Sequence, residues 1–162
     1  MSRADGVRTR GELVLHPVAL VGLAVLLVND HLLKSAAPGW WTGKLSDLAG
    51  LAFFPFLLVA LVDVLHRRGR PGTRTAVVAA CATAAVFTAI KTSGVAREAW
   101  TGAVGLLRYP VDAVTSGADR PVTVVVAADV SDVLAVVACA LVVVVVHRHA
   151  RARYAIAVGG GR

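Results

Sequence analysis

Four long apolar runs divide the chain, and short polar segments separate them. A helix needs roughly 20 mostly apolar residues to cross the hydrocarbon core of a membrane. The fourth run is rich in valine, but a single strand in lipid leaves its backbone N–H and C=O groups unpaired, so a helix is expected there too. The pattern therefore predicts an all-α fold, a four-helix transmembrane bundle with spans at about residues 13–33, 47–66, 75–94 and 127–146.

The composition favours a membrane over a soluble core. Hydrophobic residues make up 57% of the 162 positions, whereas soluble domains have about 45–50%. Aromatic residues, which are prominent in large soluble cores, account for only 6%. We therefore expect the lipid bilayer to surround this protein as a multi-pass chain.

Arginines in short flanking segments predict the orientation. They lie at positions 3–10, 67–74 and 148–153, and segments rich in lysine and arginine remain in the cytoplasm. Both termini are then cytoplasmic. The predicted organisation is a basic cytoplasmic N-terminus, a four-span domain that includes an amphipathic outer loop, and a basic cytoplasmic tail, at residues 1–12, 13–146 (loop 95–126) and 147–162.

The net charge of +7 raises the alternative of nucleic acid binding. No soluble stretch is long enough to build a basic reading surface, so we expect no nucleic acid partner. The first run also resembles a signal peptide, with Ser-Ala-Ala at 35–37 as a cleavage site. That run is longer than the usual apolar segment of a signal peptide, and polar residues separate it from the small ones, which favours a retained span.

Most charged residues that lie in or beside the apolar runs gather at one predicted depth in the membrane. The stretch "NDHLLKSAAPGWWTGKLSDLAGLAFFPF", residues 29–56, covers the outer ends of the first two spans, and further charges lie near the outer ends of the other two. Charged residues inside a membrane normally turn inward and pair. The candidate residues for ligand or ion binding are Asp30, Lys34, Lys44, Asp47, Lys91, Asp129 and Asp132.

Helical spacing predicts how these charges pair, because residues three or four apart share a face. Asp30 and Lys34 have this spacing, and so do Lys44 with Asp47 and Asp129 with Asp132. Two neighbouring carboxylates need a cation, and Lys91 on the preceding span is the natural candidate. Purely structural pairing and a site for a ligand, ion or substrate both remain open.

Short similarities suggest an internal duplication. "SDLAGL" at 46–51 and "SDVLAV" at 131–136 each open an apolar run that closes in His-Arg, and "WTG" occurs twice. Two parallel-repeat helical hairpins would produce this pattern, with the site at their interface; chance similarity in a narrow alphabet is the alternative. The segment 95–126 predicts an amphipathic interfacial helix followed by a turn broken by proline and glycine.

Several chemistries find no support in the sequence. There is no P-loop, dinucleotide-binding glycine motif or nucleophile elbow, so we expect no such cofactor. An oxygen-rich metal site would have to use the aspartates and His31, but the nearby lysines oppose it, so no metal is expected. Cys81 and Cys139 lie apart in apolar runs and indicate neither a disulfide framework nor a zinc site.

One segment carries a family resemblance. The residues "NDHLLK" and "TGKLSDLAGLAFFP", in the first third of the chain, resemble a segment of small, functionally uncharacterised bacterial integral membrane proteins. The resemblance implies a bacterial membrane location and brings no activity, cofactor or catalytic residue.

The leading interpretation is a bacterial inner-membrane protein whose outward polar layer binds or moves a small ion, polar solute or lipid head group. A membrane-embedded enzyme acting on a lipid or lipid-linked phosphate is the second class, with lysines holding phosphate and an aspartate as general base. A scaffold subunit without a ligand is the third. Four spans are few for a transporter, which favours a homodimer.

Overall fold

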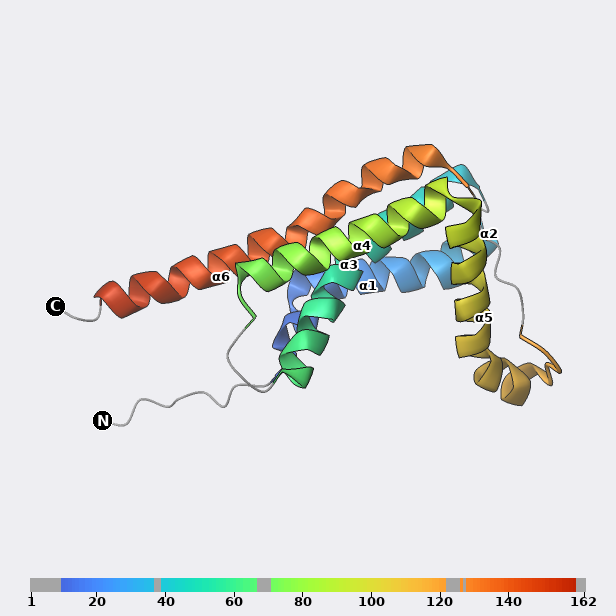
Figure 1. Cartoon of the computed structure of the whole chain (residues 1–162), viewed down its shortest axis with the longest axis horizontal. Coiled ribbons are helices and arrows are strands. Elements are labelled where there is room, and N and C mark those ends of the chain that lie inside the picture. The colour runs from blue at the N-terminus through green and yellow to red at the C-terminus, as the bar shows by residue number, and fades with distance from the viewer. Residues whose placement is uncertain (1–9, 37–38, 67–70, 122–125, 127, 160–162) are drawn as a thin grey trace. The chain divides into compact units, whose positions relative to one another are not determined.

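The computed structural model describes residues 10–36, 39–66, 71–121, 126 and 128–159. The chain runs through a short helix η1 (Glu12–Leu15), α1 (Pro17–Val28), a π-helical turn η2 (Asn29–Leu33), α2 (Lys34–Ala36), α3 (Trp40–Leu65), α4 (Thr73–Thr92), α5 (Gly94–Ser116), a 3-10 helix η3 (Val130–Cys139) and α6 (Ala140–Gly159) (Figure 1). Within these ranges there is no strand. The predicted all-α class is confirmed.

Among the described residues, four helical segments are long and apolar enough to cross a membrane: Pro17–Ala36, Trp40–Leu65, Thr73–Thr92 and Val130–Ala152. The predicted number of spans is therefore confirmed. The second helix begins a full turn or more before the expected residue 47, because the Thr42 hydroxyl bonds both the N–H and the C=O of Gly39 at its start. The last helix runs to Gly159 instead of ending at 146. Residues 1–9 of the basic N-terminal segment and residues 67–70 of the basic segment 67–74 lie outside the described residues.

The structure forms two compact units, one made of residues up to Ala84 and from Ala135 on, the other of Ala85–Leu134. The first unit is centred on the packing of α1 against α3 (Figure 1). Gly22 of α1 lies so close to α3 that a Cβ there would stand 3.2 Å from the carbonyl oxygen of Ala49. Small residues of this kind let two membrane helices approach closely, which gains van der Waals contact.

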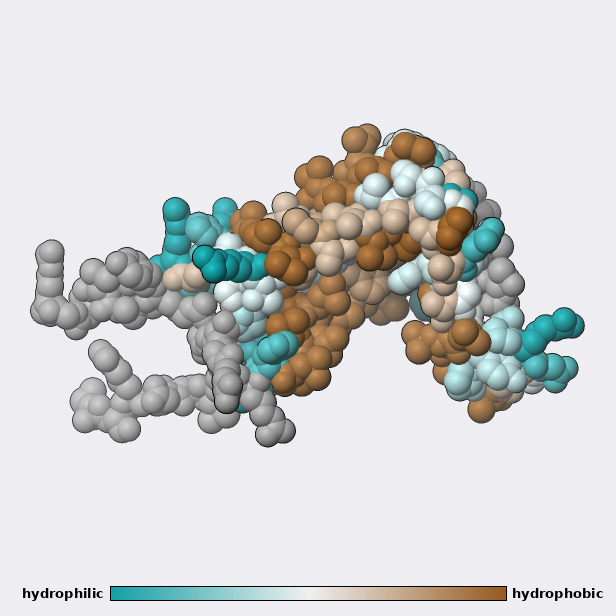
Figure 2. Space-filling model, in the orientation of Figure 1, coloured by the Kyte–Doolittle hydropathy of each residue, from teal (hydrophilic) through white to brown (hydrophobic). Residues whose placement is uncertain are grey.

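Apolar side chains fill the core of the first unit and also cover its surface. Phe56, Val59 and Val142 are fully buried, and α6 packs on α3. Large apolar side chains are also exposed on the helices of this unit, for example Val21, Leu61 and Val78. Figure 2 shows extensive brown, hydrophobic surface along the helices. A soluble protein rarely exposes so extensive an apolar surface, whereas lipid tails cover it without cost.

The second unit joins the end of α4 to α5 through one extended residue. Ser93 takes up an extended backbone (φ −113°, ψ 126°), and its hydroxyl accepts a hydrogen bond from the Ala96 N–H, so it caps α5. Figure 1 shows α5 turning away from α4 at this point. Gly117, in the left-handed region at φ 64°, ends α5, as glycine commonly does at a helix C-terminus.

Candidate functional site

The first polar cluster begins in the π-helical turn of the first span. From Asn29 to Leu33 the helix widens, and the Lys34 N–H bonds the carbonyl of Asn29. Such single-turn bulges cost helical regularity and occur frequently at functional sites. Here the turn brings the fully buried Asn29 and the exposed Asp30 onto the side of the helix that meets α3.

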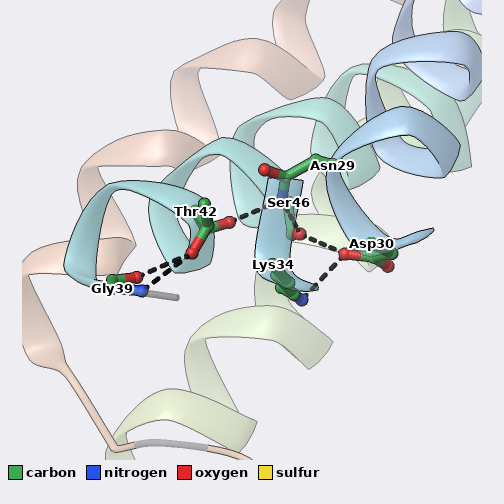
Figure 3. A network of polar contacts seen from close by, with 6 residues as sticks. All are labelled: Asn29, Asp30, Lys34, Gly39, Thr42 and Ser46. Carbon is green, nitrogen blue, oxygen red and sulfur yellow. Dashed lines mark hydrogen bonds and ion pairs between the residues drawn. The ribbon is translucent and has the colours of Figure 1, made fainter. Parts of the chain in front are cut away.

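A chain of hydrogen bonds connects this turn to α3 (Figure 3). The Asn29 side-chain amide donates to the carbonyl of Thr42 and to the hydroxyl of Ser46, each at 2.6 Å. The Ser46 hydroxyl donates to Asp30 Oδ1 at 2.5 Å, and the Lys34 ammonium lies 2.7 Å from the same oxygen. We call these five residues the α1–α3 polar network. The predicted Asp30–Lys34 pair is thus present.

Asn29 occupies an unusual position in this network. Its side chain is fully buried, and among the described residues no donor reaches its Oδ1 oxygen. A buried acceptor without a partner costs about 1–3 kcal/mol. The same side chain donates two hydrogen bonds to α3, and these connect the π-helical turn to that helix.

Lys44 and Asp47 also lie near the start of α3. The Lys44 ammonium stands 4.8 Å from the centroid of the Trp40 ring, a cation–π contact. Asp47 is half-buried, one turn beyond Lys44 on the same helix. Along α3, Lys44 thus lies between Thr42 and Ser46, and Asp47 follows Ser46 directly.

The second polar cluster is a buried ion pair in the second unit. The Lys91 ammonium, near the end of α4, lies 2.7 Å from Asp132 Oδ2 at the start of η3, and each side chain is only 7% exposed. The ammonium also stands 5.3 Å from the centre of the Phe87 ring. Arg97, in the first turn of α5, donates to the backbone carbonyl of Lys91 at 3.4 Å. Lys91, the cation predicted to neutralise Asp132, is therefore the residue that pairs with it.

Asp129 has a different local setting. Its Oδ1 oxygen accepts hydrogen bonds from the Ser131 N–H at 2.9 Å and the Ser131 hydroxyl at 2.7 Å. The Asp132 N–H in turn bonds the Asp129 carbonyl. Asp129 thus caps the beginning of η3 and holds the segment that carries Asp132.

The seven candidate residues fall into two sets. Asp30, Lys34, Lys44 and Asp47 belong to the first unit, and Lys91, Asp129 and Asp132 belong to the second. Within these sets the structure joins Asp30 to Lys34 and Lys91 to Asp132, and the Asp129 carbonyl accepts the Asp132 N–H. That all seven share one layer, and that the two hairpins are repeats, stay predictions.

The contact between Gly11 and Asp63 was not expected from the sequence. The Gly11 N–H donates to Asp63 Oδ2 at 3.0 Å, with Asp63 buried and Gly11 in the left-handed region at φ 75°. Asp63 has helical i, i+4 spacing with Arg67, but Arg67 lies outside the described residues. The Gly11 contact joins residues 52 positions apart, so no local spacing signals it.

A histidine cluster lies at the start of α1. The His16 Nδ1 accepts the Val18 N–H and caps the helix. Its ring stacks on the Phe56 ring. It meets the His149 ring edge to face, with 5.5 Å between the centroids of the two histidine rings. Burial, and secondarily the nearby His149, lower the pKa of His16 below its usual value of 6.5.

The fold and these two clusters define a class. Four apolar helices long enough to cross a bilayer, with charges paired near their ends, make this a multi-pass membrane protein. In the part of the chain that the structure describes, no three His, Cys, Asp or Glu side chains are grouped to hold a metal ion. No protein-family model matches the chain, and no curated protein or solved structure gives a significant match to it.

Proposed function

We propose that this protein binds and moves a small cation, the proton included, across a membrane, and that the cation competes with the Lys91 ammonium for the Asp132 carboxylate. The observation that carries the proposal is the buried contact of 2.7 Å between these two groups. Both come from helices that are long and apolar enough to cross a membrane.

The stability of the fold does not by itself explain why such an ion pair is buried. Removing two charges from water costs several kcal/mol per ion, and replacing a buried ion pair by well-packed apolar residues is often neutral or stabilising. Two apolar residues would join α4 to η3 at least as well. The charges of Lys91 and Asp132 therefore support a role in which charge itself is used, which is the default reading of ionisable groups inside a membrane.

The chemistry of the pair favours cations. A proton that binds to Asp132 neutralises the carboxylate and releases the Lys91 ammonium, and a metal cation displaces that ammonium from the carboxylate oxygen. In either case the pair opens, because its attraction depends on the negative charge of Asp132. By contrast, the Asp30–Lys34 pair is largely exposed, and exposed pairs contribute little.

The proposal includes a location and an assembly. We place the protein in a bacterial cytoplasmic membrane with both termini inside, because the arginines cluster in three of its polar segments. Four helices are few to enclose a path for an ion, so the proposal also includes a homodimer. Native mass spectrometry of gently extracted protein would report the number of subunits.

Ion flux into vesicles tests the proposal. The full chain is reconstituted into vesicles that enclose a pH-sensitive dye, and an outward potassium gradient with valinomycin imposes a potential. Proton flux is recorded under this potential. Sodium and potassium fluxes are followed with their own dyes in separate vesicles without valinomycin. We expect flux above that of protein-free vesicles, and we expect Asp132→Asn to abolish it.

Matched variants separate charge from folding. The double variant Lys91→Met, Asp132→Leu removes both charges and keeps apolar bulk, so it should fold and yet show no flux. Arg108→Gln is the control, because it breaks an ion pair in the same unit between Asp112 and Arg108, whose own side chain is exposed. Its flux should equal that of the wild type. Unchanged flux in a folded double variant, or no wild-type flux for any of the three cations, would contradict the proposal.

A further inference from the structure

Helix α5 exposes a row of large apolar side chains. Its 23 residues run from Gly94 to Ser116. The outward side chains are 62% to 87% exposed and comprise Val95, Leu106, Leu107, Val111 and Val114. Three of them, Leu107, Val111 and Val114, follow the spacing of four and three residues that places them on one face.

Part of the opposite side of α5 is covered, and two of its polar groups lie there. Gly105 is buried and Thr101 is half-buried. The Asp112 side chain is 14% exposed and lies 3.4 Å from Arg108. Arg97 reaches the backbone carbonyl of Lys91. A helix on a water-soluble protein shows the reverse arrangement, with its apolar side buried and its polar side outside.

We propose that the apolar face of α5 docks on the surface of the lipid bilayer, with the helix lying in the plane of the membrane. The occupant is the boundary between head groups and acyl chains. This inference concerns the attachment of α5 and does not depend on ion transport.

The length and charge of α5 favour lying on the membrane over crossing it. At a rise of 1.5 Å per residue the helix is about 35 Å long, which is enough to span. Yet Arg97, Glu98, Arg108 and Asp112 interrupt its sequence, and α5 is not among the four apolar candidates for spanning. A polar face opposite an apolar one is typical of helices that lie in the interface.

Helix α5 follows directly on α4, which is one of the candidate membrane spans. Only Ser93 separates α5 from α4, and within the same unit Val86 of α4 and Leu134 of η3 are also exposed apolar residues. The apolar face of α5 thus belongs to a unit that already presents apolar surface to lipid. Trp100 and Tyr109 on α5 add the aromatic residues that prefer this boundary.

Docking of α5 at the membrane surface would also fix the depth of Lys91. The first turn of α5 holds the Lys91 carbonyl through Arg97, and Lys91 lies one residue before the end of α4. A helix docked at the head groups therefore keeps Lys91 within about one helical turn of the membrane surface.

Spin labels on the full chain in lipid vesicles test the docking. In a background of Cys81→Ala and Cys139→Ala, single labels are attached at Leu107→Cys and Val114→Cys on the apolar face. The other two labels are attached at Glu98→Cys and Ser116→Cys, which are exposed and lie on the side of the helix opposite Leu107. We expect the first two labels to collide mainly with oxygen, which concentrates in lipid. The other two should collide mainly with a water-soluble nickel chelate.

Other results would overturn the inference. Equal access of the chelate to all four labels would mean that the apolar face is in water. Protection of Leu107→Cys from both reagents would mean that protein covers the face, and broadening of its spectrum by a neighbouring label would identify a second copy of this chain.

A second measurement leaves the apolar face unaltered. In the variant Trp40→Phe, Trp41→Phe, the one remaining tryptophan is Trp100 on α5. Its fluorescence should be quenched more strongly by lipids brominated near the head group than by lipids brominated near the chain ends. Fluorescence that neither lipid quenches would contradict the docking.

Discussion

The ammonium of Lys91 and the carboxylate of Asp132 meet at 2.7 Å across 41 positions of sequence, and water reaches almost none of either side chain. Because each group offsets the burial of the other, the two residues act as a unit in stability. Removing one leaves an uncompensated charge, whereas removing both leaves none.

Single and double variants of the pair should therefore differ sharply. Lys91→Met and Asp132→Leu should each lower the free energy of unfolding by about 3–5 kcal/mol, and the double variant should come much closer to the wild type. Equilibrium unfolding in detergent micelles measures all four proteins. Additive losses in the double variant would mean that the two side chains are not coupled.

Asn29 should be needed for the contact between the first two spans. Asn29→Leu removes the donor of two hydrogen bonds, to the Thr42 carbonyl and the Ser46 hydroxyl, and should lower the free energy of unfolding by about 1–3 kcal/mol. Ser35→Ala is the control, because that exposed hydroxyl bonds only carbonyls of its own helical segment; its effect should stay within about 0.5 kcal/mol. Equal effects of the two substitutions would count against the network.

Gly22 should tolerate a β-branched residue poorly. A Cβ at this position meets the Ala49 carbonyl oxygen at 3.2 Å, so Gly22→Val should separate α1 from α3 and lower the free energy of unfolding by about 1–3 kcal/mol. Gly43 in α3 is the matched control, since a Cβ there meets nothing within 4 Å. Gly43→Ala should raise the free energy of unfolding by about 0.5–1 kcal/mol, because glycine loses more backbone freedom on folding. The measurement is the same unfolding titration in detergent.

Acidification should destabilise the start of α1 through His16. The pKa of His16 in the folded protein lies below its value of 6.5 in an unfolded chain, chiefly because of burial and also because of His149. As the pH falls through 6.5 towards the folded pKa, the unfolded chain takes up the proton first, so the free energy of unfolding decreases over that window. Protonation also removes the acceptor that caps Val18.

The variant His16→Asn isolates this contribution. Asparagine is a good N-cap and does not titrate, so the fall in melting temperature between about pH 8 and about pH 5 should be smaller than in the wild type. His66→Asn serves as the control, because His66 is exposed at the end of α3 and its replacement should leave the fall unchanged. An equal fall in His16→Asn and wild type would exclude His16 as the cause.

The sites were predictable where pairing follows from local spacing or from charge balance. Asp30 and Lys34 are one turn apart on a helix, so their contact follows from sequence alone. Lys91 was expected near Asp132 because a buried carboxylate needs a cation. Ser46 was not expected to join Asp30, because the predicted start of its helix at 47 left Ser46 outside, whereas α3 begins at Trp40.

Contacts between distant segments followed no local rule. The hydrogen bond from Gly11 to Asp63 depends on the left-handed backbone of Gly11 and on the path of the chain before α1. The close approach of Gly22 to Ala49 depends on how α1 and α3 cross. Neither relation has a periodicity that a sequence can display.

By itself the sequence determined the class of protein and the number of its apolar helices, because a bilayer demands about 20 apolar residues per crossing and a backbone that satisfies its own hydrogen bonds. Only the tertiary structure decided which polar side chains meet, that Asn29 lies buried against Ser46, and that α5 turns its apolar side outward. The physical reason is that these relations depend on the packing of helices against one another, which nearest neighbours along the chain do not specify.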